Sequence, residues 1–417
     1  MNERPTVARC WLSALLVLAS PAWASAEEPA PLSLDEAEAV RRALARPALD
    51  EQLRATVDLA RADELAARRW PNPEASWSHE QVGGDGKTER QDVAILSQRF
   101  DLSGRRGLRG DAAGKRVEAA RADAALTRSA VEADVRRAFV DVLARGRRAA
   151  AVREAAARLE AVAAAVGRRA ASGDVAVYDR RRVERERLTL LARLDVEEGA
   201  LARARALLAA LVGAPAPASL ALRGELAPSE LPALPALLER VAERSDLRAL
   251  ALEAEAGELE ARAAGRWLVP EVELGGGLKT VGAGARRDTG FAAALTVPLP
   301  LFSRDQDARL RGHARARSAR SRLSLALDAA RAEVSGLHAE AARLGAAAGR
   351  YAQSGDADGS ALAATAEAAY RGGEAGVLEL VDAYRATLEA SLALVDLQAA
   401  ARRARVDLDR ASGGLAR

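Results

Sequence analysis

The chain has 417 residues, of which 29% are charged and only 3% are aromatic. Its 62 lysines and arginines barely exceed its 59 aspartates and glutamates, and acidic residues interrupt the arginine runs, so a nucleic-acid-binding surface is not expected. A composition rich in Ala, Leu, Arg and Glu favours long helices in close contact over a mixed α/β enzyme.

Residues 1–26 have the features of a cleaved secretory signal. Two arginines precede an apolar core at Trp11–Ala19, and the small residues Ala24-Ser25-Ala26 follow as a cleavage site. The only cysteine, Cys10, lies before the apolar core, so the mature chain is predicted to have neither a disulfide nor a lipid-carrying first cysteine. Beyond the signal no run of about 18 apolar residues remains, so no membrane-spanning helix is expected.

The first half of the mature chain begins with a helical segment. Ser33 and Glu36 have capping-box spacing, and the helix is predicted to continue to about Arg69. The helical period then disappears in two candidate strands, 73–82 and 91–100, which are separated by a glycine-rich turn. A long helix is predicted over 104–172. At about 1.5 Å per residue it would extend on the order of 100 Å.

A return helix follows the turn at Gly173. Leu194, Leu201 and Leu208 recur in it at the seven-residue spacing of a coiled-coil seam. This helix ends at Gly213, and the proline-rich stretch 214–235 is predicted to be a linker in an equatorial region between two halves.

The second half repeats the order of the first. "RWLVPEVEL", starting at Arg266, parallels "RWPNPEASW", starting at Arg69, and two strands with a period of two follow, one from Val272 and one around Phe291. A long helix from about Arg304 is interrupted at Gln353–Ser360 and turns at Gly372-Gly373. The predicted organisation is therefore a first repeat over 27–213, the linker over 214–235 and a second repeat over 236–417.

These elements require several copies of the chain. Four amphipathic strands would leave unpaired edges in a membrane, at several kcal/mol for each unpaired group, and narrow Ala-rich helices of this length cannot bury themselves in one monomer. The copy number stays open at this point, because two chains would supply eight strands and three would supply twelve. In such an assembly the two helical turns would form a ring at the end distant from the strands.

Four stretches carry a resemblance to a known family. They are "LSLDEAEAVRRAL", "QRFDLSGRRGLRG", "VPLPLFSRDQDARLRG" and "AYRGGEAGVLELVDAYRATLEA". With these motifs the whole mature chain resembles the TolC-like outer-membrane efflux proteins, and the second and third are most similar to the heavy-metal branch for cobalt, zinc and cadmium. The resemblance implies a mainly α fold with a small β part: long coiled-coil helices form an α-barrel tunnel, and each protomer of a homotrimer contributes four strands to a twelve-stranded outer-membrane β-barrel.

The resemblance also implies a function and partners. Such a protein is the passive exit duct of a tripartite efflux system in the outer membrane of a Gram-negative bacterium. It would bind a periplasmic adaptor (membrane fusion) protein and an inner-membrane transporter of the RND type. Heavy-metal cations would be the cargo, although the sequence itself does not name one. No cofactor and no resident metal are implied.

Carried over residue by residue, the acidic gate of this family corresponds to Glu379 and Asp382. These residues lie at i and i+3 and so on one face of a helix. Three copies would form a constriction that attracts cations. Asp179 and Arg182 occupy the matching positions of the first repeat and would bond across to the second turn. The simpler interpretations are a solvated face for Glu379 and Asp382, and surface pairs at i and i+4 for the run Asp179–Arg187.

No set of residues points to catalysis. His79, His313 and His338 are the only histidines and lie in unrelated segments, whereas a metal site requires convergent ligands. The glycine-rich stretch Gly275–Gly284 lacks the Gly-Lys-Ser/Thr ending of a phosphate loop. The competing hypothesis is a periplasmic coiled-coil adaptor or scaffold, but an adaptor has one helical hairpin flanked by β-rich domains.

Overall fold

The computed structural model describes residues 32–84, 87–172, 176–215, 217, 220–283 and 285–415. The predicted signal at 1–26 and the predicted turn at Gly173 lie outside these residues. Among the described residues, no helix is long and apolar enough to cross a membrane.

The same order of elements occurs twice along the chain: two short helices, two strands and a hairpin of long helices. The first set is α1 (Glu36–Leu44), α2 (Pro47–Arg68), β2 (Glu74–Gly84), β3 (Lys87–Phe100), α3 (Arg105–Ala171) and α4 (Val177–Val212). The second set is α5 (Leu234–Val241), α6 (Ser245–Gly265), β5 (Val272–Ala283), β6 (Arg286–Thr296), α7 (Gln306–Gly372) and α8 (Val377–Ala411). The predicted strand pairs are thus present, and each strand is longer than predicted.

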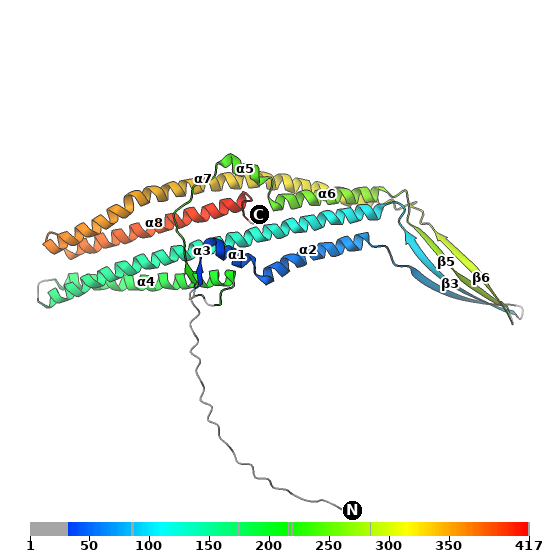
Figure 1. Ribbon diagram of the computed structural model, residues 1–417, viewed down its shortest axis with the longest axis horizontal. Helices are drawn as coiled ribbons and strands as arrows, with labels where there is room; N and C mark the ends of the chain where they lie inside the picture. Colours follow the sequence, from blue (N-terminus) through cyan, green and yellow to red (C-terminus); the bar gives the residue numbers. More distant parts are fainter. Residues whose placement is uncertain are drawn as a thin grey trace, which may run out of the picture.

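The helices form a curved layer one helix thick (Figure 1). α3 and α7 run its whole length, and at 67 residues each they extend about 100 Å. Next to the strands the order across the layer is α2, α3, α6, α7, and in the distant half it is α4, α3, α8, α7. The four-stranded sheet therefore lies at one end of the molecule, and the ends of the two helical hairpins, α3–α4 and α7–α8, lie at the other (Figure 1).

One sequence prediction near the middle of the layer is wrong. Ser33 belongs to a short strand, β1 (Leu32–Leu34), and Asp35 is the N-cap, accepting a 2.7 Å hydrogen bond from the backbone N–H of Glu38. β1 pairs in parallel with β4 (Leu220–Leu222), so the predicted linker contains a strand. The pairing partner of β1 is far away in sequence, and local spacing alone does not reveal it.

The predicted interruption at Gln353–Ser360 is also wrong, because α7 continues as one helix through these residues. Two glycines there cost about 1 kcal/mol each relative to alanine. No proline removes a backbone donor, however, so the hydrogen-bond ladder of the helix remains possible.

Close contact between α6 and α7 depends on two glycines. A carbon at the Cβ position of Gly312 would lie 2.6 Å from the backbone nitrogen of Ala261, and one at Gly257 would lie 2.7 Å from that of Ala316. Neither distance is possible for a real side chain, so these two positions must be glycine for the helices to pack at this separation.

Candidate functional site

The four long strands form one antiparallel sheet in the order β2-β3-β5-β6. β3 of the first half pairs with β5 of the second half over twelve residues, so the central pair joins the two repeats. Within the part of the chain that the structure describes, β2 and β6 each pair on one side only. Their outer edges therefore leave backbone N–H and C=O groups without strand partners.

One face of this sheet presents apolar side chains to the outside. Trp77, Ala94, Leu278 and Phe291 are register partners and form a row across all four strands. Trp77 is 69% exposed, Leu278 is 63% exposed and Phe291 is 76% exposed. The neighbouring rows on this face contain Ala75, Leu96, Gly276 and Ala293, and then Gln98, Leu274 and Leu295. An unpartnered apolar band of this kind is typical of a surface that contacts other apolar material.

The opposite face of the sheet is more polar. The Ser97 hydroxyl donates a 2.7 Å hydrogen bond to Oε1 of Glu273, and Nη2 of Arg99 lies 3.5 Å from Oε2 of the same carboxylate. Lys279 follows Leu278 and so points to this side. The alternation predicted for β5 and β6 is therefore confirmed, and it divides the sheet into an apolar and a polar face.

The predicted gate residues lie in the first turns of α4 and α8, at the end of the molecule farthest from the sheet. Asp179 and Glu379 are both the third residue of their helix, after the N-caps Ala176 and Gly376. The Glu379 carboxylate accepts a hydrogen bond from the backbone N–H of Gly376. Glu379 thus caps its own helix and lies exposed at the hairpin end.

The structure brings Glu379 and Asp382 together on one exposed helix face, and Arg182 is also exposed. Among the described contacts, neither Asp179 nor Arg182 bonds to Glu379 or Asp382, so the predicted link between the two turns is not made within one chain. Other residues join the hairpins. Arg193 of α4 forms a 2.6 Å ion pair with Glu389 of α8.

A second ion pair joins the same two helices, with the arginine on α8 and the acid on α4. Nε of Arg385 on α8 lies 3.8 Å from Oε1 of Glu186 on α4. The predicted pairing of Glu186 with Arg182 is therefore wrong. Glu184 likewise pairs with Arg187, not with Arg180, and Arg187 also contacts Glu160 of α3. Packing of α4 against α3 and α8 selects these partners over the neighbours at i+4.

Below these ion pairs the two hairpins share an apolar core. It includes Leu159 of α3, Leu190 of α4, and Leu380 and Leu388 of α8. A small cavity of about 120 Å³ lies between the three helices, and both ion pairs line it. Tyr384 also lines the cavity. Burial and a 2.7 Å hydrogen bond from its hydroxyl to Glu367 raise the pKa of Tyr384 to about 12.

Sequence reasoning missed a polar cluster that joins α3, α4 and α8. Arg148 of α3 donates hydrogen bonds to both oxygens of Glu197 on α4 and to Asp396 on α8, with the shortest distance to each carboxylate being 2.7 Å. Glu197 is almost completely buried. The hydrogen bonds from Arg148 lower the pKa of Glu197 despite the opposing effect of burial.

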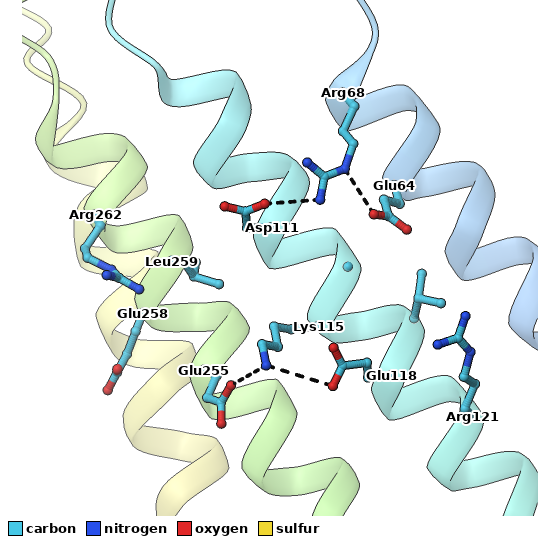
Figure 2. A pocket seen from close by; sticks show the side chains of 12 residues that line it. Glu64, Arg68, Asp111, Lys115, Glu118, Arg121, Glu255, Glu258, Leu259 and Arg262 are labelled. Atoms are coloured by element: carbon cyan, nitrogen blue, oxygen red, sulfur yellow. Dashed lines mark hydrogen bonds and ion pairs between the residues drawn. The ribbon is translucent and has the colours of Figure 1, made fainter.

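A groove of about 650 Å³ lies between α2, α3 and α6 near the sheet (Figure 2). Its charges largely pair with each other: Arg68 contacts Glu64 and Asp111, and Lys115 contacts Glu255 at 2.9 Å and Glu118 at 3.9 Å (Figure 2). Paired charges leave little attraction for a ligand, so we interpret the groove as a furrow between helices.

The histidines do not converge. His79 Nδ1 lies 2.7 Å from Asp92, and His338 Nε2 lies 3.2 Å from the Pro232 carbonyl oxygen. Among the described residues, no three His, Cys, Asp or Glu side chains are placed to hold a metal ion.

Comparisons with known proteins decide the fold. VceC, an outer membrane protein of Vibrio cholerae, superimposes with a TM-score of 0.73 at 20% identity, covering 91% of this chain and 96% of that one. The open state of the MtrE outer membrane channel of Neisseria gonorrhoeae gives a TM-score of 0.74 at 19% identity, covering 91% and 89%. This chain has the fold of the outer-membrane channel proteins. The resemblance predicted from the motifs is thus confirmed for the fold.

One curated protein is also similar to this chain in sequence. The cobalt-zinc-cadmium resistance protein CzcC of Cupriavidus metallidurans is 31% identical over 251 residues, which are 58% of this chain and 57% of that protein. The chain thus matches somewhat more than half the length of this curated relative. No family model matches the chain.

Proposed function

We propose that the protein is the outer-membrane exit duct of a tripartite efflux system. The observation that carries this proposal is the exposed apolar row Trp77–Ala94–Leu278–Phe291 on a sheet at one end of a helical layer about 100 Å long. Apolar side chains on one face of a strand pair suit lipid, and the polar face suits a water-filled lumen. The channel fold of VceC and MtrE supports the same interpretation.

The sheet requires closure in a membrane. If β6 of one protomer pairs with β2 of the next, the open edges acquire hydrogen-bond partners and no strand edge faces hydrocarbon. Three protomers would then form a barrel of twelve strands, and three helical layers would enclose a tunnel through the periplasm. We propose this homotrimer as the assembly that conducts the cargo.

The narrow point of the duct is proposed to be the ring of hairpin ends. Three copies of Glu379 and Asp382 would place six carboxylates around the mouth, and such rings favour cations over anions. Asp179 and Arg182 of a neighbouring protomer are the proposed partners of this ring. Such bonds would join two protomers and therefore could not form within a single chain.

The relative CzcC, whose name specifies cobalt, zinc and cadmium, supports heavy-metal cations as the proposed cargo. The duct itself would be passive, since the energy for export would come from an inner-membrane transporter, of the RND type, acting through a periplasmic adaptor. The adaptor hypothesis for this chain itself is disfavoured. The described part of the chain has two long helical hairpins and a four-stranded sheet built by both halves, not one hairpin between β-rich domains.

The test is single-channel conductance of the detergent-extracted oligomer in a planar bilayer. Wild type is compared with Glu379→Gln/Asp382→Asn, which removes two charges per chain while keeping an oxygen at position 379 for the helix cap. The matched control is Asp328→Asn/Glu340→Gln, two exposed acids of α7 far from the mouth. We expect cation-selective openings in wild type and control, and a clear loss of selectivity in the mouth variant. An absence of openings from a folded, outer-membrane-derived wild-type oligomer would refute the channel.

A further inference from the structure

The ends of the two hairpins carry opposite charge, although they occupy equivalent places in the two repeats. Residues 168–187, around the first turn, contain seven arginines against four acidic residues. Residues 368–387, around the second turn, contain two arginines against three acidic residues. The end of α3 and the start of α4 lie at the same end of the molecule as the end of α7 and the start of α8 (Figure 1). The duplicated architecture therefore presents one basic and one acidic end side by side.

The arginines of the first hairpin end are exposed and unpaired within the described part of the chain. We define the basic tip as Arg168 and Arg169 in the last turn of α3 with Tyr178, Arg180, Arg181 and Arg185 in the first turns of α4. None of its five arginines makes an ion pair or a side-chain hydrogen bond to another described residue. On the same helix, Glu184 and Glu186 are already occupied by Arg187 and Arg385. Asp179 is a further acid of α4 within the tip, between Tyr178 and Arg180.

The basic tip also has an ordered outward face. Tyr178, Arg181 and Arg185 recur at spacings of three and four residues and so form one stripe along α4. Val183, which is buried against the second hairpin, lies midway between the two arginines in sequence and so on the opposite side of the helix. Tyr178 is 66% exposed and its neighbour Val177 is 59% exposed. An exposed aromatic ring flanked by arginines is a common composition for the centre of a protein interface.

We propose that the basic tip binds the acidic end of a helical segment of a partner protein, whose carboxylates pair with these arginines and whose apolar side chain packs on Tyr178. Guanidinium groups bind carboxylates in a bidentate manner, which gives both affinity and orientation. The proposal rests on the proposed function, because it specifies the chemistry of the surface that the periplasmic adaptor would present. It adds that the two hairpins of one chain select differently charged parts of the partner.

An anionic membrane is a less suitable occupant. The exposed acids Glu374, Glu379 and Asp382 lie at the second hairpin end, at the same level along the molecule. A flat anionic surface would attract one hairpin end and repel the other. A protein can present acids opposite the first hairpin and bases opposite the second, so it satisfies both.

The test measures association of defined probes with the full-length oligomer in detergent. The probes are a synthetic antiparallel helical hairpin with glutamates in its loop-proximal turns, the same hairpin with lysines in their place, and phosphatidylglycerol vesicles. Wild type is compared with Arg180→Glu/Arg181→Glu/Arg185→Glu and with the conservative control Arg180→Lys/Arg181→Lys/Arg185→Lys. Wild-type conductance is recorded in the same preparation, so that the channel and the docking surface are judged separately.

We expect the acidic hairpin to associate with wild type about tenfold faster than the lysine hairpin, with a rate that falls as salt is added. The glutamate variant should lose this preference and the lysine variant should keep most of it. Equal binding of both hairpins, or capture of the vesicles and not of the acidic hairpin, would overturn the proposal while wild-type openings leave the channel intact. Failure of the glutamate variant to form the oligomer would assign these arginines to contacts between copies and would also overturn it.

Discussion

Arg193 of α4 and Glu389 of α8 form a 2.6 Å ion pair that joins the first helical hairpin to the second near the mouth. Arg385 and Glu186 form a second, longer link on the same side of the shared cavity. These contacts link the hairpins of one protomer beside their shared apolar core, whereas among the described residues the gate residues proposed from the family resemblance make no such contact.

Breaking this link should open the mouth more often with little loss of stability. In Glu389→Gln the hairpins lose one cross-link, and because both partners are partly exposed the folding free energy should fall by less than about 1 kcal/mol. The expected result is a higher open probability in planar bilayers. The exchange Arg193→Glu/Glu389→Arg should return the open probability toward wild type. Equal open probabilities in all three proteins would show that the pair does not restrain the mouth.

Glu197 should contribute stability that depends on pH. Because hydrogen bonds from Arg148 lower its pKa in the folded protein, its contribution is present above the unfolded-state pKa of about 4.3 and is lost as the pH falls through the lower folded value. Glu197→Gln should cost about 1–3 kcal/mol at pH 7 and progressively less below pH 4, measured by denaturant titration. The neighbouring Glu198→Gln, an exposed control paired with Arg153, should cost under about 1 kcal/mol. A constant cost for Glu197→Gln down to pH 3 would contradict this assignment.

One added methyl group should have opposite effects at two places on α7. Gly312→Ala forces a carbon against the backbone of Ala261, so we expect a loss of about 1–3 kcal/mol and a lower melting temperature. Gly336→Ala meets nothing within 4 Å and should stabilise the helix by up to about 1 kcal/mol. Equal melting temperatures for the two variants would mean that α6 and α7 do not pack as closely in the assembled protein.

The effect of a charge added to the sheet should depend on the face that carries it. Phe291→Lys places an ammonium group on the proposed lipid face and should weaken membrane insertion by about 2–4 kcal/mol. Ala292→Lys, one residue along the same strand, points to the polar face and should be tolerated. Recovery of heat-resistant oligomer from outer membranes measures both. If Ala292→Lys were the more damaging variant, the assignment of the two faces would be reversed.

Much of the architecture could be predicted because its signals are local. Alternation at Val272 and Phe291, the leucine heptads of α4 and the repeated glycine turns each require only neighbouring residues. The positions of Glu379 and Asp382 at the distant mouth followed from the same periodicity together with the family motif. The predictions that failed, at Ser33 and at Gln353–Ser360, rested on local signals alone, whereas β1 pairs with the distant β4 and α7 continues as one helix.

The contacts that join the two halves could not be predicted from the sequence. Arg193 and Glu389 are 196 residues apart, and Arg148 and Asp396 are 248 apart. Many acids along the chain would satisfy an arginine equally well by composition, and Arg193 has one of them, Glu197, at i+4. Local chemistry by itself determined that this protein is a duplicated set of long amphipathic helices and short strands with a charged turn region in each half. Only the tertiary structure decided which charges meet and in which order the four strands pair, because both depend on how helices and strands from the two halves align side by side.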